Sequence, residues 1–245
     1  VGTTLFFTAR GVNGERELWT SDGTAAGTVL VKDIAPGGDD DYAPELLTES
    51  GGTLFFRART VDDGSELWRS DGTPAGTVMV KDLNPGTSYG DPRSGYPEYL
   101  ADVGGTVYFS AVDGTGRELW TSDGTAAGTT RVADIAPGDG WSYPQDFTAV
   151  GATVFFTADN GVSGRELWKT DGAASGTVLV EDIHPGSFTT GGVTYPNHSY
   201  PGQLTVSGGR AYFAAEDAHG REIWRSDGTA AGTVLLRDIR PGAGS

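Results

Sequence analysis

The chain has 245 residues, of which 37% are hydrophobic and 10% aromatic, and it carries a formal net charge of −16 and no cysteine. This length and composition suit one large all-β domain and exclude disulfide or thiolate chemistry. The negative charge argues against nucleic acid as a partner, because phosphate backbones are bound largely through Lys and Arg, and no apolar run approaches the ~20 residues of a membrane helix.

Short strands and turns alternate along the whole chain as five repeats. Each repeat carries Glu-Leu-Trp or Glu-Ile-Trp followed by Asp-Gly, then a Val-rich run and Asp-Ile/Leu-x-Pro-Gly. Successive repeat tryptophans lie 49, 52, 48 and 56 residues apart. A period near 50 residues with short strands is typical of propeller blades. The tryptophan and turn aspartate of the repeats are Trp19 and Asp22, Trp68 and Asp71, Trp120 and Asp123, Trp168 and Asp171, and Trp224 and Asp227.

Each repeat is expected to contain about four strands. In the third repeat we assign residues 144–150 to the first strand, 106–110 to the second, 117–121 to the third and 129–135 to the fourth. The second strand is apolar at consecutive positions, as in Leu54-Phe55-Phe56, which predicts that both of its faces are covered. No stretch shows helical periodicity or helix caps, so we expect almost no helix.

These patterns predict an all-β fold, a β-propeller of five blades with about four antiparallel strands each. The chain is then a single domain, 1–245, built of repeats at approximately 1–43, 44–96, 97–143, 144–200 and 201–245. The first-strand sequence occurs only four times, near Leu46, Leu100, Phe147 and Leu204. Either one blade has three strands, or the natural chain extends beyond these ends, and a larger ring is the alternative to closure at five.

The repeats also resemble a known family. They read ELWTSDGTAAGT, ELWRSDGTPAGT, ELWKTDGAASGT and EIWRSDGTAAGT, and this pattern is similar to the ELWxxDGT repeat family of bacterial surface and secreted proteins. The resemblance covers all five repeats and departs from the pattern at Ala173 and Ile223. It implies a propeller-like fold and an extracellular or cell-surface location, and it implies no particular activity.

We interpret the most repeated polar and aromatic residues as structural. An aspartate in a turn accepts hydrogen bonds from nearby backbone amides while the following glycine supplies a positive φ. One tryptophan in each repeat, flanked by Leu or Ile, fills the space against a neighbouring blade. The Glu before it, preceded by Arg in four repeats, suggests charge contacts between blades.

Ligand-binding candidates lie in the connections from each fourth strand to the next first strand. These connections are rich in aromatic residues and Pro, and in propellers they share a face with the second-to-third connections. Aromatic rings stack on sugar faces while acidic and amide groups bind hydroxyls, so the combination predicts a sugar-binding surface led by Trp141. For Tyr96, Tyr143 and Tyr200 the alternative is that Tyr-Pro anchors the loop to the blade. The candidates are Trp141, Tyr143, Tyr42, Tyr89, Tyr96, Tyr195, Tyr200, Asp113, Asn160 and Asp217.

No cofactor is required by these patterns. Calcium is the metal alternative, because Asp39-Asp40-Asp41 offers the oxygen ligands that it prefers, although the spacing of an EF-type loop is absent.

The sequence therefore predicts a secreted or cell-surface binding module that is lectin-like and multivalent. Its expected partners are glycans or surface proteins, with no membrane insertion, and it can work as part of a longer chain. A structural or protein-interaction scaffold is the first alternative, and a glycan-active hydrolase is the second. Enzymatic motifs are scarce, because His184, His198 and His219 are scattered and no nucleophile elbow or phosphate loop occurs.

Overall fold

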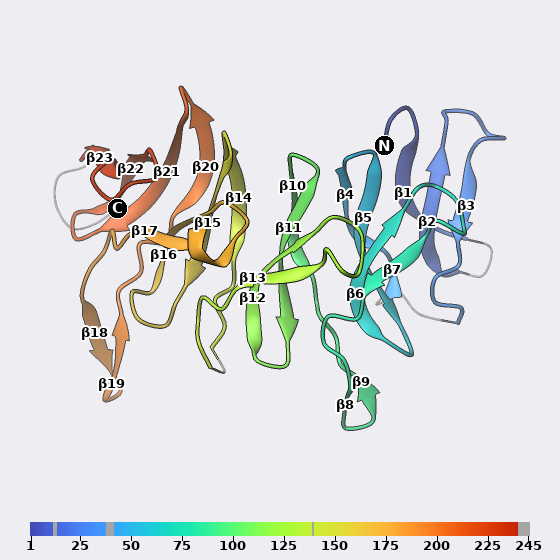
Figure 1. Ribbon diagram of the computed structural model, residues 1–245, viewed down its shortest axis with the longest axis horizontal. Coiled ribbons are helices and arrows are strands. Elements are labelled where there is room, and N and C mark those ends of the chain that lie inside the picture. Colours follow the sequence, from blue (N-terminus) through green and yellow to red (C-terminus); the bar gives the residue numbers. More distant parts are fainter. Residues whose placement is uncertain (12–13, 38–41, 139, 240–245) are drawn as a thin grey trace. The chain divides into compact units, whose positions relative to one another are not determined.

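The computed structural model describes residues 1–11, 14–37, 42–138 and 140–239 (Figure 1). These residues form antiparallel sheets without any α-helix, which confirms the all-β prediction. One turn of 3-10 helix, η2 (Ala174–Gly176), follows the Asp-Gly turn of the fourth repeat. No helix in the described residues is long and apolar enough to cross a membrane.

Five main sheets follow one another along the chain, and in each the strands pair in sequence order. The first sheet has three strands, β1 (Leu5–Arg10), β2 (Arg16–Ser21) and β3 (Val29–Lys32). The other four have four strands each. These are β4 (Glu45–Ser50), β5 (Thr53–Thr60), β6 (Gly64–Ser70) and β7 (Val78–Lys81) in the second sheet; β10 (Glu98–Val103), β11 (Thr106–Asp113), β12 (Gly116–Ser122) and β13 (Thr130–Ala133) in the third; β14 (Gln145–Val150), β15 (Thr153–Asp159), β16 (Arg165–Thr170) and β17 (Val178–Glu181) in the fourth; and β20 (Gly202–Ser207), β21 (Arg210–Asp217), β22 (Gly220–Ser226) and β23 (Val234–Arg237) in the fifth.

Two connections between main sheets carry small hairpins of their own. One consists of β8 (Thr87–Ser88) and β9 (Asp91–Pro92), and the other of β18 (Ser187–Thr190) and β19 (Val193–Pro196). These hairpins account for the extra length of the second-to-third and fourth-to-fifth connections.

One strand assignment from the sequence is wrong. Residues 144–150 were expected to belong to the third repeat, but β14 pairs with β15 and opens the fourth sheet. The first strand of the third sheet is β10, which precedes β11. The reason is local: a two-residue Gly turn joins each first strand to the second strand that follows it, and so short a connection makes the two strands antiparallel neighbours.

The chain divides into two compact units, Val1–Gly114 with Trp120–Thr130, and Thr115–Leu119 with Arg131–Ser245. Within them, consecutive sheets pack through equivalent positions. In the first unit, Leu18 and Val31 of the first sheet meet Phe56 and Trp68 of the second. The second and third sheets form the same kind of cluster through Leu67, Val80, Phe109 and Trp120. In the second unit, the fourth and fifth sheets form it through Leu167, Val180, Phe213 and Trp224.

The second strand is buried on both faces, as its continuous apolar sequence predicted. In β5, Leu54 and Phe55 are each 3% exposed and Phe56 is fully buried, although successive residues point to opposite faces. A covered strand of this kind needs a packed neighbour on each side.

The polar groups of the Asp-Gly turn bond to one another. In the second repeat the Asp71 carboxylate accepts hydrogen bonds from the Thr73 amide at 2.9 Å and from the Thr73 hydroxyl at 2.7 Å. These two bonds hold the pKa of Asp71 below its ordinary value. The turn satisfies its own polar groups and therefore needs no ligand.

Candidate functional site

The connections that begin the third, fourth and fifth sheets lie against the end of a second strand. The Asp159 amide, at the end of β15, donates to the Ser142 carbonyl at 2.8 Å, and the Glu216 amide donates to the Ser199 carbonyl at 2.7 Å. The same bond joins Val112 to Gly95 in the first unit, at 2.6 Å. The fourth-to-first connections therefore share a side with the second-to-third connections, as the sequence predicted.

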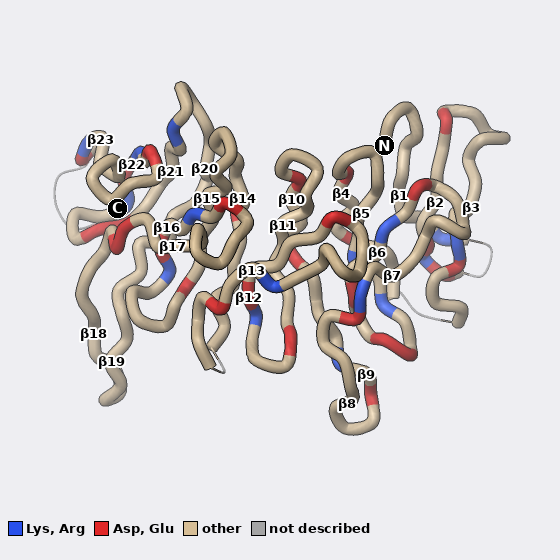
Figure 2. Tube along the Cα trace, viewed as in Figure 1, with Lys and Arg blue, Asp and Glu red and all other residues tan. Residues whose placement is uncertain are grey.

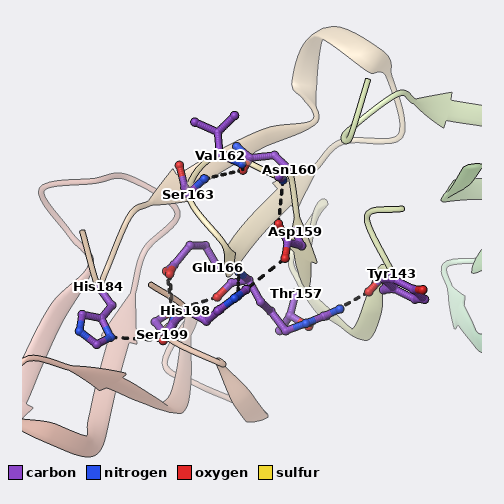
Figure 3. A network of polar contacts seen from close by, with 12 residues as sticks. Tyr143, Thr157, Asp159, Asn160, Val162, Ser163, Glu166, His184, His198 and Ser199 are labelled. Atoms are coloured by element: carbon purple, nitrogen blue, oxygen red, sulfur yellow. Dashed lines mark hydrogen bonds and ion pairs between the residues drawn. The ribbon is translucent and has the colours of Figure 1, made fainter. Parts of the chain in front are cut away.

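In the second unit, Arg165 donates hydrogen bonds to residues of two connections on this side. Figure 3 labels its partners Tyr143, Thr157 and His198. Its guanidinium donates to the Tyr143 carbonyl at 3.0 Å and to the Thr157 hydroxyl at 3.2 Å. Its backbone amide donates to His198 Nδ1 at 2.8 Å. Arg165 starts β16 directly after the β15–β16 turn, so one residue contacts the connection before β14 and the connection before β20.

The His198 ring contacts the Arg165 amide, the Asp159 carboxylate and the Tyr200 ring. Its Nδ1 accepts from the Arg165 amide, which places any proton of the neutral ring on Nε2. The Asp159 carboxylate lies 3.7 Å from the same nitrogen. The ring stacks on Tyr200 with centroids 5.0 Å apart. His184 Nδ1 lies 3.3 Å from the His198 carbonyl, so two histidines that looked scattered in the sequence are neighbours across the β18–β19 hairpin.

Two aromatic pairs stand on the connections that Arg165 joins. Trp141 packs against Tyr143 with centroids 5.5 Å apart, and His198 stacks on Tyr200. Three of the rings are half exposed, at 46% for Trp141, 44% for Tyr143 and 51% for Tyr200. Exposed rings fixed by a neighbouring ring form a rigid apolar surface at the edge of the sheets.

The tyrosine has a left-handed backbone in the three Tyr-Pro pairs that directly precede a first strand. Tyr96, Tyr143 and Tyr200 have φ values of 42°, 45° and 43°. A bulky residue avoids this region unless its surroundings impose it, and such strain gathers at functional positions. Here the surroundings include backbone bonds, since the Tyr96 amide donates to the Ser65 carbonyl at 3.0 Å.

The buried glutamates of the second, third and fourth repeats each hold the residue just before one of these tyrosines. Glu166, fully buried, accepts from the Ser199 amide at 2.9 Å and from the Ser199 hydroxyl. Glu66 accepts from the Gly95 amide at 2.6 Å and from the Leu83 amide at 2.9 Å. In the third repeat, Glu118 accepts from the Ser142 hydroxyl at 2.7 Å.

Burial raises the pKa of these carboxyls. It raises the pKa of Glu66 to about 8 and that of Glu166 to about 7, and it also raises the pKa of Glu118. The sequence suggested charge contacts between blades for these glutamates. Their bonds to backbone amides and to the hydroxyls of Ser142 and Ser199 anchor the aromatic connections. The small residue before Tyr-Pro, Gly or Ser, was the signal that could have revealed this role.

The first unit has a polar cavity of about 380 Å³ beside Tyr96, which precedes the third sheet as Tyr143 precedes the fourth. It is lined by Arg57, Tyr96 and Glu98 among others. Arg57 forms ion pairs with Glu45 and, at 3.5 Å, with Glu98. In the paired strands Arg57 takes the place that Thr157 has in the fourth sheet, opposite the repeat leucine.

The remaining ligand candidates lie in other hairpins, turns and strand ends. Tyr89 is fully exposed at the β8–β9 hairpin, and Tyr195 stacks on Phe188 across the β18–β19 hairpin with centroids 5.7 Å apart. Tyr42 lies under the Arg59 guanidinium at 4.9 Å. Three polar candidates serve turns or strand ends: Asn160 accepts from the Val162 and Ser163 amides, Asp217 accepts from the His219 amide, and Asp113 ends β11.

The predicted calcium ligands Asp39, Asp40 and Asp41 lie outside the described residues. Within the described residues, the carboxylates of Glu15, Glu17 and Asp33 come within 4.8 Å of one another, in the first repeat. Two of them already accept backbone bonds, from Gly37 to Glu15 at 2.7 Å and from Ile34 to Glu17 at 3.1 Å. Calcium binding stays a prediction.

No family model matches the chain, and no curated protein matches it. Its fold is similar to that of puromycin hydrolase, with a TM-score of 0.53, 17% identity, and coverage of 94% of this chain and 34% of that one. A puromycin-hydrolyzing peptidase of Mycobacterium tuberculosis has a TM-score of 0.51 and 13% identity, with 99% and 36% covered. Prolyl oligopeptidase B of Galerina marginata has a TM-score of 0.51 and 11% identity, with 100% and 35% covered.

This chain therefore spans about a third of the length of these proteins. They are β-propeller proteins, and the likeness shows that this chain has a β-propeller-like fold.

Proposed function

We propose that this chain is a secreted or cell-surface binding module that recognises carbohydrate through the aromatic connections of its repeats. The observation that supports this most is the arrangement around Arg165. Two aromatic pairs, Trp141 with Tyr143 and His198 with Tyr200, lie on these connections, three of the four rings are half exposed, and Arg165 is hydrogen-bonded to both connections. Rings of this kind stack on the apolar face of a sugar, while the Asp159 carboxylate beside them accepts bonds from hydroxyls.

The charge of the chain favours neutral or cationic glycans over anionic ones. Figure 2 marks acidic residues on loops and strand ends of both units. The cavity of the first unit contains two arginines and two glutamates, so its formal charges cancel. A ligand with many hydroxyls and no net charge therefore fits this cavity better than a sulfated or phosphorylated one.

The repeats supply the second part of the proposal, multivalency. The cavity beside Tyr96 and the network around Arg165 occupy corresponding places in different repeats. Several weak sites of one kind gain affinity together when the target presents repeated sugars. We propose also that the five sheets are the blades of one closed ring. The equivalent packing of consecutive sheets supports this, and solution scattering tests it, since a compact chain of this length has a radius of gyration of about 18 Å.

A glycan array probed with the intact chain tests the function. We expect binding to one class of neutral sugar, weakened about two- to tenfold by Trp141→Ala and again by Tyr200→Ala. Tyr89→Ala is the matched control, because Tyr89 is an exposed aromatic residue outside the paired rings. A blank array with folded protein would reject the carbohydrate proposal. It would favour the scaffold function, which the edge of β1, unpaired among the described residues, also supports.

A further inference from the structure

The first sheet is one strand short on one side. In the other four sheets the second strand is paired on both edges, for example β5 between β4 and β6. In the first sheet, β1 pairs with β2, and no strand among the described residues pairs with its other edge. An open edge presents unpaired backbone groups, which is a template for one more strand.

A cavity lies beside this open edge. It measures about 400 Å³ and is lined by Thr8 of β1, Arg16, and residues 43–47, which lead into β4. First strands lie beside one another in consecutive sheets, since β4 contacts β10 in the first unit and β14 contacts β20 in the second. A strand added to β1 would therefore also lie beside β4.

We propose that the free edge of β1 is a docking site for one extended segment with the sequence of the repeat's own first strand, as in Glu45–Ser50. The pairing of β4 with β5 fixes the register, because Thr8 and Phe6 occupy in β1 the places of Arg57 and Phe55 in β5. The glutamate of the added strand then faces Thr8, and its threonine faces Phe6. The added strand pairs by main-chain hydrogen bonds, as in other cases of strand addition.

Side chains around the edge fit such a segment. Phe147 of β14 packs on Phe156 of β15 with centroids 5.7 Å apart, and Phe7 has the place of Phe156 in β1. The apolar residue of the added strand, Leu47 in β4, would pack on Phe7 in the same way. The Ser50 hydroxyl of β4 donates a hydrogen bond to the Asp102 carboxylate of β10 at 2.5 Å. Glu49 occupies in β4 the position that Asp102 has in β10, so it is placed to accept the same bond from the serine of the added strand.

The test uses the intact chain and a fluorescent peptide with the sequence of residues 44–52. We expect saturable binding by anisotropy, with slower hydrogen exchange of the amides of β1 in the complex. A peptide of the same composition in scrambled order, and one methylated on alternate backbone nitrogens, should not bind. Absence of saturable binding by the native peptide would overturn the proposal.

A substitution in β1 tests the register. Thr8→Arg recreates the Arg57 position, and its guanidinium should pair with the peptide glutamate as Arg57 pairs with Glu45. We expect Thr8→Arg to tighten binding of the native peptide about two- to fivefold, and to leave binding of a peptide with Gln in place of that Glu unchanged. An equal effect on both peptides would contradict the register. A dimer that the peptide cannot dissociate, with β1 already protected, would mean that a second copy occupies the edge.

Discussion

The turn glycine Gly124 of the third sheet packs against the ring of Phe55 in the second sheet: a Cβ atom on Gly124 would lie 3.1 Å from Cζ of Phe55. The same contact recurs between Gly72 and Phe6, and between Gly228 and Phe155. The glycine therefore has two duties, the positive φ of the Asp-Gly turn and the close approach of one sheet to the next.

A matched pair of substitutions separates these duties. Gly124→Ala should lower the free energy of unfolding through both the left-handed backbone and the clash with Phe55, by about 2–4 kcal/mol. Gly23 has a similar φ of 92° but nothing within 4 Å of its Cβ position, so Gly23→Ala should cost only about 1 kcal/mol. Urea denaturation of the two variants gives the difference, and equal losses would contradict the packing role.

The fourth repeat lacks the threonine that closes the other Asp-Gly turns. At its place, Ala173 bonds to Asp171 through its amide alone, at 2.9 Å. In the third repeat, Thr125 bonds to Asp123 through its amide and its hydroxyl. Ala173→Thr should therefore raise the melting temperature by about 2 °C, and Thr125→Ala should lower it by a similar amount. Calorimetry checks both, and a loss of stability in Ala173→Thr would show that the added methyl group does not fit.

The buried glutamates predict a stability that falls as pH rises. Because burial raises the pKa of Glu66 to about 8, and those of Glu17 and Glu166 to about 7, the folded state binds more protons than the unfolded state above pH 4.5, the ordinary pKa of a glutamate. Their contribution to the free energy of unfolding is fully present below about pH 4.5 and is lost as pH rises toward about 8. Each group loses about 1.4 kcal/mol for every pH unit between its unfolded and its folded pKa.

Urea denaturation at about pH 5 and about pH 8.5 measures this loss. Glu66→Gln removes one titrating group and should reduce the difference in unfolding free energy between the two pH values. An unchanged difference in Glu66→Gln would mean that Glu66 keeps its charge in the folded protein.

Arg165 should matter for ligand binding more than its charge alone explains. Arg165→Lys keeps the charge but loses the planar fork that reaches the Tyr143 carbonyl and the Thr157 hydroxyl. We expect sugar binding to weaken about three- to tenfold while the unfolding midpoint changes little. Arg210→Lys, at the exposed start of β21, is the control and should leave binding unchanged. Full binding by Arg165→Lys would mean that Arg165 does not position the aromatic connections.

The sequence by itself determined the all-β class, the repeated strand pattern and the self-contained Asp-Gly turns, because these depend on neighbours within a few residues. Strand and turn signals depend on residues close in sequence. The continuous apolar run Leu54-Phe55-Phe56 predicts burial on both faces of its strand without identifying the residues that cover it. The sequence also pointed to Trp141 and the Tyr-Pro pairs as exposed aromatic residues on shared connections.

Only the tertiary structure decided which residues hold those connections in place. Arg165 joins Tyr143 to His198 across 55 positions of sequence, and Glu166 reaches Ser199 across 33. The β18–β19 hairpin brings His184 beside His198, and the open edge of β1 is visible only once strand pairing is known. Contacts between residues so far apart in sequence depend on how the strands pair and pack, and the local pattern of residue types does not predict that geometry.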